Sequence, residues 1–222
     1  MKKVVVIDNL TETFKGSIVR SGLQKSSKLD ARAFAKMGYD THYVYAGLCE
    51  DEYNYTHHIV DTLGSKDRAV VEGKNPSRVS RYYIRDYLTK VEDVIKDADY
   101  IIAHCHSVSM ITNINLLVKN KRIMFVIHDV IDLMWCYGTS DVIRRMHKSD
   151  RNMIYMATNS HYSIQRMTDI NARAIKAGYE DIPLTGEEAF DGYIKHFVWT
   201  DEVVTNEDIE RVEPKSAIIG RY

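Results

Sequence analysis

The sequence predicts an α/β fold, namely a Rossmann-like parallel sheet with helices on both faces. Short apolar runs rich in β-branched residues recur along the chain, as they do in strands that are buried on both faces. Segments with apolar residues at helical spacing separate these runs, and this alternation is typical of right-handed βαβ units. The chain has 222 residues, 45% of them hydrophobic and 27% charged, which is enough for a substantial core.

The first part of the chain carries a strand, a helix and a second strand. Residues 3–8 form a β-branched run that ends in an acid, which predicts a buried parallel strand. Residues 21–38 predict a helix with Ser21 as its N-cap and Gly38 as its C-cap. Residues 41–47 predict the second strand. The buried stripe of the helix is expected to contain Leu23, Ser27, Ala31, Phe34 and Met37.

The rest of the chain continues the alternation. Residues 48–74 are polar and weakly periodic, which indicates a long excursion with room for short strands. Asn75 and Pro76 then start a helix that is expected to run to residue 99. The remaining predicted elements are strands at 100–105, 122–129, 152–159 and 196–203, and helices at 107–120, 139–150 and 160–170, the last of them starting at Ser160.

Composition narrows the class of protein. The formal net charge is −1, so binding of nucleic acid or of a membrane surface would need a local patch. No run approaches the roughly 20 apolar residues that cross a bilayer, and the apolar run after Lys3 is too short for a signal peptide. Cys49, Cys105 and Cys136 are far apart with no CxxC spacing, which is typical of reduced thiols. We therefore expect a cytoplasmic protein.

Polar residues at the carboxyl ends of the predicted strands are the candidate site, because ligands bind there in open α/β sheets. Asp8 ends the first strand, and Gly16 and Gly22 lie in the loop and helix start that follow. The free N–H groups of a helix N-terminus suit an anion, so Gly22 is a candidate substrate contact, although loop geometry alone also explains a glycine there. No GxGxxG or GxxxxGK[ST] fingerprint supports a nucleotide-binding loop.

A histidine cluster ends the strand at 100–105. His104 and His106 would point to the same side of the strand, but two ligands without a third do not make a metal site. We therefore predict no metal. His106 and the neighbouring Ser107 are instead candidate substrate contacts, with a loop hydrogen bond as the simpler alternative.

An ionisable pair, His128 and Asp129, ends the strand at 122–129. A carboxylate at that edge of the sheet can take a proton from a hydroxyl nucleophile. It can equally cap the next turn, and position alone leaves both interpretations open. Asp132 is a competing carboxylate three residues later. Asp129 and His128 are thus the candidate catalytic residues.

Three arginines form a basic face on the helix that starts near residue 75. Arg78, Arg81 and Arg85 are spaced by three and four residues, with tyrosines between them. Such a face can contact phosphates, so these are candidate substrate-binding residues. A solvated helix face explains the same pattern.

Taken together, these segments resemble the N-terminal domain of a GT-B glycosyltransferase, an enzyme with two facing Rossmann-like domains. The resemblance is carried by the glycine-led helix and VYA strand at 22–47, the strand ends DADYIIAHCHS at 97–107 and FVIHD at 125–129, and NMIYMATNSHYSIQRM at 152–167. The terminal IIGRY at 218–222 is similar to the strand that opens the second domain. The segments most resemble the phage DNA α-glucosyltransferase type.

This resemblance implies a nucleotide-sugar donor held mainly by the second domain and a hydroxyl acceptor, with hydroxymethylated DNA as one candidate, held by the first. It implies no obligatory metal or cofactor. Asp129 or His128 would lie at the acceptor hydroxyl, and Gly22 near the donor phosphates. Residues 1–205 would form the acceptor-side domain, and 206–222 a linker and the first strand of a truncated donor domain.

The resemblance therefore implies a fragment, a truncated product or one half of a split enzyme, inactive without the donor half. A separately encoded donor-binding domain is then an expected partner, and a phage-encoded chain would act in the host cytoplasm. The alternative function is a stand-alone Rossmann-like binding or interaction module without catalysis. It would bind nucleic acid through the arginine face or pair with a separate donor domain.

Overall fold

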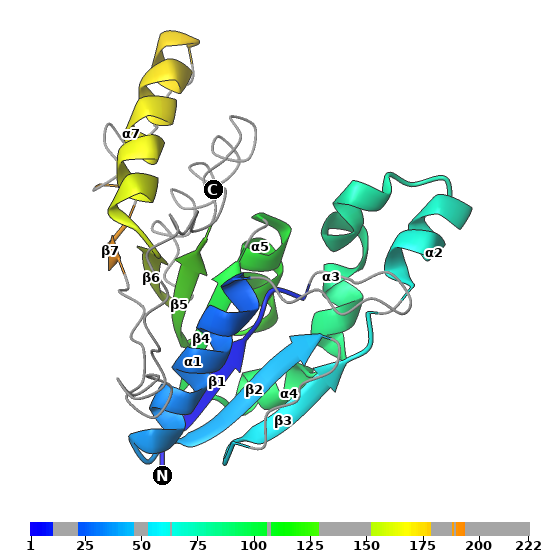
Figure 1. The fold of residues 1–222 in the computed structure, drawn as a ribbon, viewed down its shortest axis with the longest axis vertical. Coiled ribbons are helices and arrows are strands. Elements are labelled where there is room, and N and C mark those ends of the chain that lie inside the picture. The colour runs from blue at the N-terminus through cyan, green and yellow to red at the C-terminus, as the bar shows by residue number, and fades with distance from the viewer. Residues whose placement is uncertain are drawn as a thin grey trace, which may run out of the picture.

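The described part of the chain forms a seven-stranded parallel sheet. A computed structural model of the protein describes residues 1–10, 22–46, 53–62, 64–105, 108–128, 152–178, 188 and 190–193. The strand order is β3-β2-β1-β4-β5-β6-β7, and every neighbouring pair runs parallel. Helices pack on both faces (Figure 1). This confirms the predicted Rossmann-like α/β class.

Elements alternate along the chain as the sequence predicts. The strands are β1 (Lys3–Ile7), β2 (Asp40–Ala46), β3 (Thr56–Val60), β4 (Tyr100–Cys105), β5 (Arg122–Ile127), β6 (Met153–Thr158) and β7 (Gly192–Tyr193). The helices are α1 (Gly22–Lys36), α2 (Ser65–Val71), the 3₁₀ turn η1 (Pro76–Arg78), α3 (Val79–Thr89), α4 (Glu92–Asp97), α5 (Val108–Leu117) and α7 (His161–Lys176).

Successive residues of each strand serve two different cores. In β1, Val4 and Val6 pack on the side of α1, whereas Val5 and Ile7 pack on the opposite side. All four side chains are fully buried. A strand covered on both faces needs an unbroken apolar run, because neither face meets water. This is why the apolar runs of the sequence located the strands.

The two faces carry different helices. α1 lies across one face, where Ala31 and Phe34 pack on the strands (Figure 1). The other face is covered by α3, α4, α5 and α7, through side chains such as Leu88, Ile95 and Ile111. The α1 face therefore has the smaller apolar cluster in the described residues, and it also carries the two polar clusters described below.

One long helix was expected from Asn75 to residue 99, and the structure corrects this. It has the 3₁₀ turn η1, then α3, then a separate short helix α4. The break lies at Lys90 and Val91, whose N–H groups bond three rather than four residues back. Just before it, the Thr89 hydroxyl donates to the Arg85 carbonyl at 2.8 Å, a side-chain bond that bends helices. The apolar stripe continues across the break.

The excursion at 48–74 contains both a strand and a helix. β3 pairs in parallel with β2 at the edge of the sheet, in a segment whose sequence leaves room for short strands. The helix α2 was not expected, because it is short and presents Val70 and Val71 to solvent rather than an inward stripe. The short strand β7 was not expected either.

Two predicted helix caps are confirmed, whereas the helix expected at 160–170 continues to Lys176. Ser160 caps α7, since its hydroxyl accepts from the Ser163 N–H at 3.2 Å. Gly38 follows α1 with φ 81°, a left-handed conformation suited to glycine. Met37 was wrongly placed on the buried stripe and is 61% exposed, because α1 ends at Lys36.

Several predictions lie outside the described residues. They are the Ser21 cap, the side chain of Leu23, the helix at 139–150, the strand at 196–203 and the linker and strand at 206–222. No helix in the described ranges is long and apolar enough to span a bilayer.

Candidate functional site at the carboxyl edge of the sheet

Three ionisable side chains, Asp8, His104 and His128, lie on the α1 side of the sheet at the carboxyl ends of the central strands. Ala103 and Cys105 of β4 pack in the core opposite α1, so His104 between them points toward α1. His128 follows β5 on the same side and contacts His104. Asp8 follows β1 and interacts with side chains of α1 and β2. This edge is where ligands bind in open parallel sheets.

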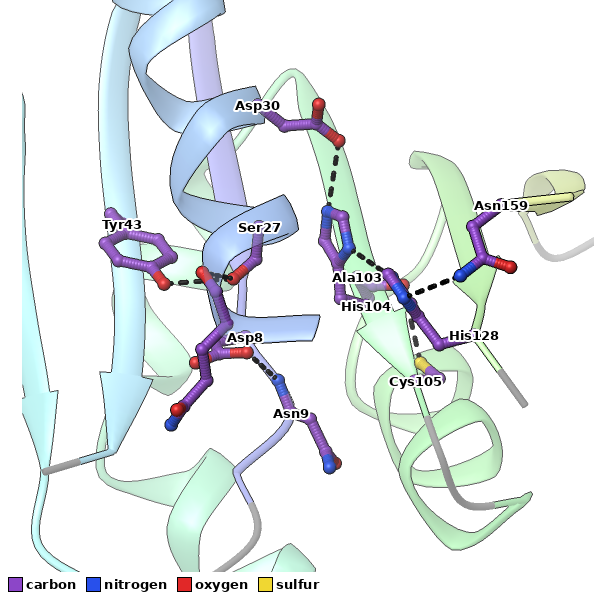
Figure 2. A network of polar contacts seen from close by, with 11 residues as sticks. Asp8, Asn9, Ser27, Asp30, Tyr43, Ala103, His104, Cys105, His128 and Asn159 are labelled. Carbon is purple, nitrogen blue, oxygen red and sulfur yellow. Dashed lines mark hydrogen bonds and ion pairs between the residues drawn. The ribbon is translucent and has the colours of Figure 1, made fainter. Parts of the chain in front are cut away.

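Four side chains, from α1, from β4 and from the residues that follow β5 and β6, are joined in one line of hydrogen bonds, which we call the histidine network (Figure 2). Asp30 Oδ2 of α1 lies 3.1 Å from His104 Nε2. His104 Nδ1 lies 2.9 Å from His128 Nε2. His128 Nδ1 lies 3.2 Å from the amide nitrogen of Asn159, which follows β6. Each ring nitrogen of both histidines therefore has a partner.

The positions of the ring protons follow from the two ends of this network. The Asn159 amide nitrogen only donates, so His128 Nδ1 accepts. An ionised Asp30 only accepts, so His104 Nε2 carries a proton and His104 Nδ1 is left to accept. His128 Nε2–H must then donate to His104 Nδ1. Both rings are thus neutral Nε2–H tautomers, and this assignment satisfies all three contacts.

Burial decreases from the middle of the network to its two ends. The His104 side chain is fully buried, whereas the Asp30 side chain is 21% exposed. His128 and Asn159 are half-buried. Two hydrogen bonds to backbone carbonyls connect the strand ends. The His128 N–H donates to the Cys105 carbonyl at 3.3 Å, and the Thr158 hydroxyl donates to the Ile127 carbonyl at 3.0 Å. His128 is therefore held between β4 and β6.

A second polar group under α1, which we call the Asp8 cluster, consists of Asp8, Asn9, Ser27 and Tyr43. The Asn9 N–H donates to the Asp8 carboxyl at 2.6 Å. The Ser27 and Tyr43 hydroxyls lie 2.9 Å apart (Figure 2). Burial raises the pKa of Asp8 to about 7, and hydrogen bonds from Asn9, Ser27 and Tyr43 act in the opposite direction. Asp8 therefore changes charge near neutral pH.

The helix α1 supplies a residue to each polar group. Ser27 and Asp30 are three residues apart and so lie on one helix face. That face is toward the sheet, since Ser27 and Ala31 are fully buried. A buried helix face with a serine and an aspartate is unusual, because polar groups cost free energy in a core unless they are paired.

The predicted site residues other than the three arginines fall into three groups. His128 lies in the histidine network. Gly22 is the first residue of α1. Asp129, His106 and Ser107 lie outside the described residues.

The arginines lie away from the histidine network. Arg78, Arg81 and Arg85 are on η1 and α3, in the helix layer on the face of the sheet opposite α1, and Arg81 and Arg85 are exposed. Of the tyrosines between them, Tyr83 is 1% exposed and belongs to the core, as does Tyr87 just beyond. These two rings therefore do not form a stacking surface for nucleic-acid bases beside the arginines.

The sequence did not single out Asp30 or Asn159. His104 was considered as a metal ligand with His106, and the structure pairs it with Asp30 and His128 instead. The available signal for Asp30 was its position three residues after Ser27, because Ser27 was on the expected buried stripe. In the described ranges, no group of three or more His, Cys, Asp or Glu side chains is arranged to hold a metal ion.

Comparisons with known proteins give no family. No protein-family model and no curated protein matches the chain. The C-terminal domain of the coenzyme A biosynthesis bifunctional protein CoaBC has a TM-score of 0.45 and 9% identity, over 71% of this chain and 76% of that one. A putative sugar kinase from Clostridium perfringens has a TM-score of 0.42 and 12% identity, over 80% of this chain and 65% of that one. Similarities this low carry no argument about function.

Proposed function

We propose that this chain is the acceptor-side domain of a glycosyltransferase that moves a sugar from a nucleotide-sugar donor to a hydroxyl group. The parallel Rossmann-like sheet is the fold that the resemblance to GT-B enzymes implies. The observation that carries the proposal is the environment of His128, within the HD pair at the end of β5.

His128 is arranged as a general base. In the assigned tautomer its Nδ1 lone pair accepts a hydrogen bond from Asn159 at 3.2 Å. An acceptor hydroxyl that displaces the Asn159 amide would donate its proton to the same lone pair at the same range of distance. Asp129, the next residue, is the second candidate base at this position.

The reaction balances with either base. The acceptor oxygen bonds to the anomeric carbon of the sugar, and the bond from that carbon to the nucleotide diphosphate breaks. The departing diphosphate takes the bonding electron pair, and the base takes the hydroxyl proton. General-base assistance of this kind is typically worth about 10²- to 10⁴-fold in rate.

The test is transfer of labelled sugar by this chain together with a donor-binding domain, encoded after Tyr222 or by a neighbouring gene. Nucleotide sugars would be screened against hydroxymethylated DNA, glycans and small hydroxyl compounds. We expect transfer with one donor class, and a loss of about 10²-fold or more for His128→Asn or Asp129→Asn. The 222-residue chain alone should be inactive.

His58→Gln is a matched control. His58 Nε2 lies 2.8 Å from His42 Nδ1, the same pairing that His128 makes with His104, but on the edge strand β3. This variant should retain normal transfer. Wild-type turnover in both the His128 and Asp129 variants would refute the proposed site, and transfer by the isolated chain would refute the need for a donor half.

A further inference from the structure

The histidine network extends much further into the protein than a general base requires. His128 and Asn159 follow β5 and β6 at the carboxyl edge of the sheet, whereas His104 is fully buried and Asp30 comes from the middle of α1. A buried imidazole with both nitrogens paired is costly to assemble, because each polar atom must find a partner away from water. His104 and Asp30 are therefore expected to affect the protonation of His128.

We propose that Asp30 and His104 are positioning residues, which hold His128 in the Nε2–H tautomer and stabilise its protonated form. This inference rests on the proposed role of His128 as a base. It adds two residues, neither of which would contact the substrate.

The tautomer is set by chemistry at the buried end. A carboxylate offers no proton, so Asp30 requires His104 to carry its proton on Nε2, 3.1 Å away. His104 Nδ1 can then only accept, which requires His128 to carry its proton on Nε2, 2.9 Å away. His128 Nδ1, the atom on the Asn159 side, is left with its lone pair. Without this constraint, Nδ1 could carry the proton and could not act as a base.

The same arrangement favours the charged state of His128. When Nδ1 takes a proton, the ring becomes an imidazolium whose Nε2–H already donates to a neutral ring. The negative charge of Asp30 lies beyond that ring, in a region screened from water by the buried His104. A nearby negative charge in low dielectric stabilises a cation more than it would in water. Asp30 need not take the proton to have this effect.

A second line of one carboxylate and two histidines, elsewhere in the sheet, provides a control. Asp40 Oδ1 lies 3.3 Å from His42 Nε2, and His42 Nδ1 lies 2.8 Å from His58 Nε2. This second carboxylate–histidine–histidine line has the same order of atoms. It begins at the first residue of β2, and so lies at the opposite end of the strands from His128. Asp40→Asn therefore removes a carboxylate from a similar but more exposed line, without touching the histidine network.

The experiment is nitrogen-15 NMR of the histidine rings in the 222-residue chain, at a series of pH values. In the wild type we expect an unprotonated Nδ1 and a protonated Nε2 on His128. Asp30→Asn should give a mixture of tautomers and lower the titration midpoint of His128, because it removes the negative charge beyond His104. Asp30→Glu should restore part of the shift, and Asp40→Asn should leave His128 unchanged. His104→Gln, which also breaks the network, should produce the same tautomer mixture.

Activity gives a separate measurement. In the enzyme completed with its donor half, Asp30→Asn should lower kcat by about 10-fold or more, with little change in the KM for the acceptor. An unchanged His128 tautomer and titration in both Asp30→Asn and His104→Gln would overturn the inference. If the NMR changes occur but both His128→Asn and Asp129→Asn transfer sugar normally, the tautomer assignment stands and the proposed function fails.

Discussion

Replacing Asp8 with asparagine should make the protein more stable at alkaline pH. The carboxyl is 1% exposed, and burial raises its pKa from 3.8 to about 7. The folded state therefore holds this proton more tightly than the unfolded state does. Well below the unfolded pKa of 3.8 both states are protonated and the group costs nothing. As pH rises from about 4 to 7, the unfolded chain loses the proton first, so the free energy of unfolding falls.

The size of the effect follows from the pKa difference. A shift of about 3 units corresponds to about 4 kcal/mol above pH 7, with a slope of at most about 1.4 kcal/mol per pH unit. The asparagine side chain would imitate the protonated acid. Its oxygen can accept from the Asn9 N–H, and its amide can donate to the hydroxyl oxygens of Ser27 and Tyr43. We therefore expect a small change at about pH 4 and a gain of up to about 4 kcal/mol at about pH 8.

The assay is urea unfolding of the wild type and of Asp8→Asn at pH values from about 4 to about 9, followed by circular dichroism. The difference between the two proteins isolates Asp8, because other titrating groups are common to both. Asp97→Asn is the control, since Asp97 is exposed and its hydrogen bond with Lys3 lowers its pKa. That variant should show no gain at high pH. Parallel curves for Asp8→Asn and the wild type would refute the reasoning about burial.

Three further substitutions test other parts of the structure. Ser160→Ala should destabilise the protein by about 1 kcal/mol in the same unfolding assay, because it removes the N-cap of α7; an unchanged midpoint would contradict that cap. Gly38→Ala should cost about 1 kcal/mol from backbone strain alone, since φ is +81° and an added Cβ would contact nothing within 4 Å. Changing Arg78, Arg81 and Arg85 together to glutamine should alter sugar transfer less than about threefold, because they lie on the other face of the sheet. If that triple variant instead loses salt-dependent DNA binding in a filter-binding assay, the alternative function as a binding module is favoured.

The fold was predictable because its signal is local. An apolar run such as 100–105 must be covered on both faces, and this property is visible without tertiary contacts. The same is true of the caps Ser160 and Gly38, whose roles depend on their own backbone. The break between α3 and α4 was missed because the apolar stripe continues through it, so periodicity alone did not mark the end of α3.

The site was predictable only at the strand ends. His128 was found because the end of a buried strand is a position that sequence can identify. Asp30 was missed because it lies in the middle of a helix, where an aspartate ordinarily faces water, and its partner His104 is 74 residues away. Asn159 was missed because asparagine is common after a strand. Contacts across the sheet edge depend on strand order, which the sequence does not state.

The two polar groups have one structural cause, which is the composition of α1. Helices on the opposite face bury large apolar side chains such as Leu88, Ile95 and Ile111, as stability alone would favour. α1 buries Ser27 and holds Asp30 against His104. This helix therefore contributes less hydrophobic stabilisation, and it carries a carboxyl group near its own midpoint. Buried polar residues at such a cost, beneath a helix that lies across one face of the sheet, are typical of sites where side chains serve chemistry.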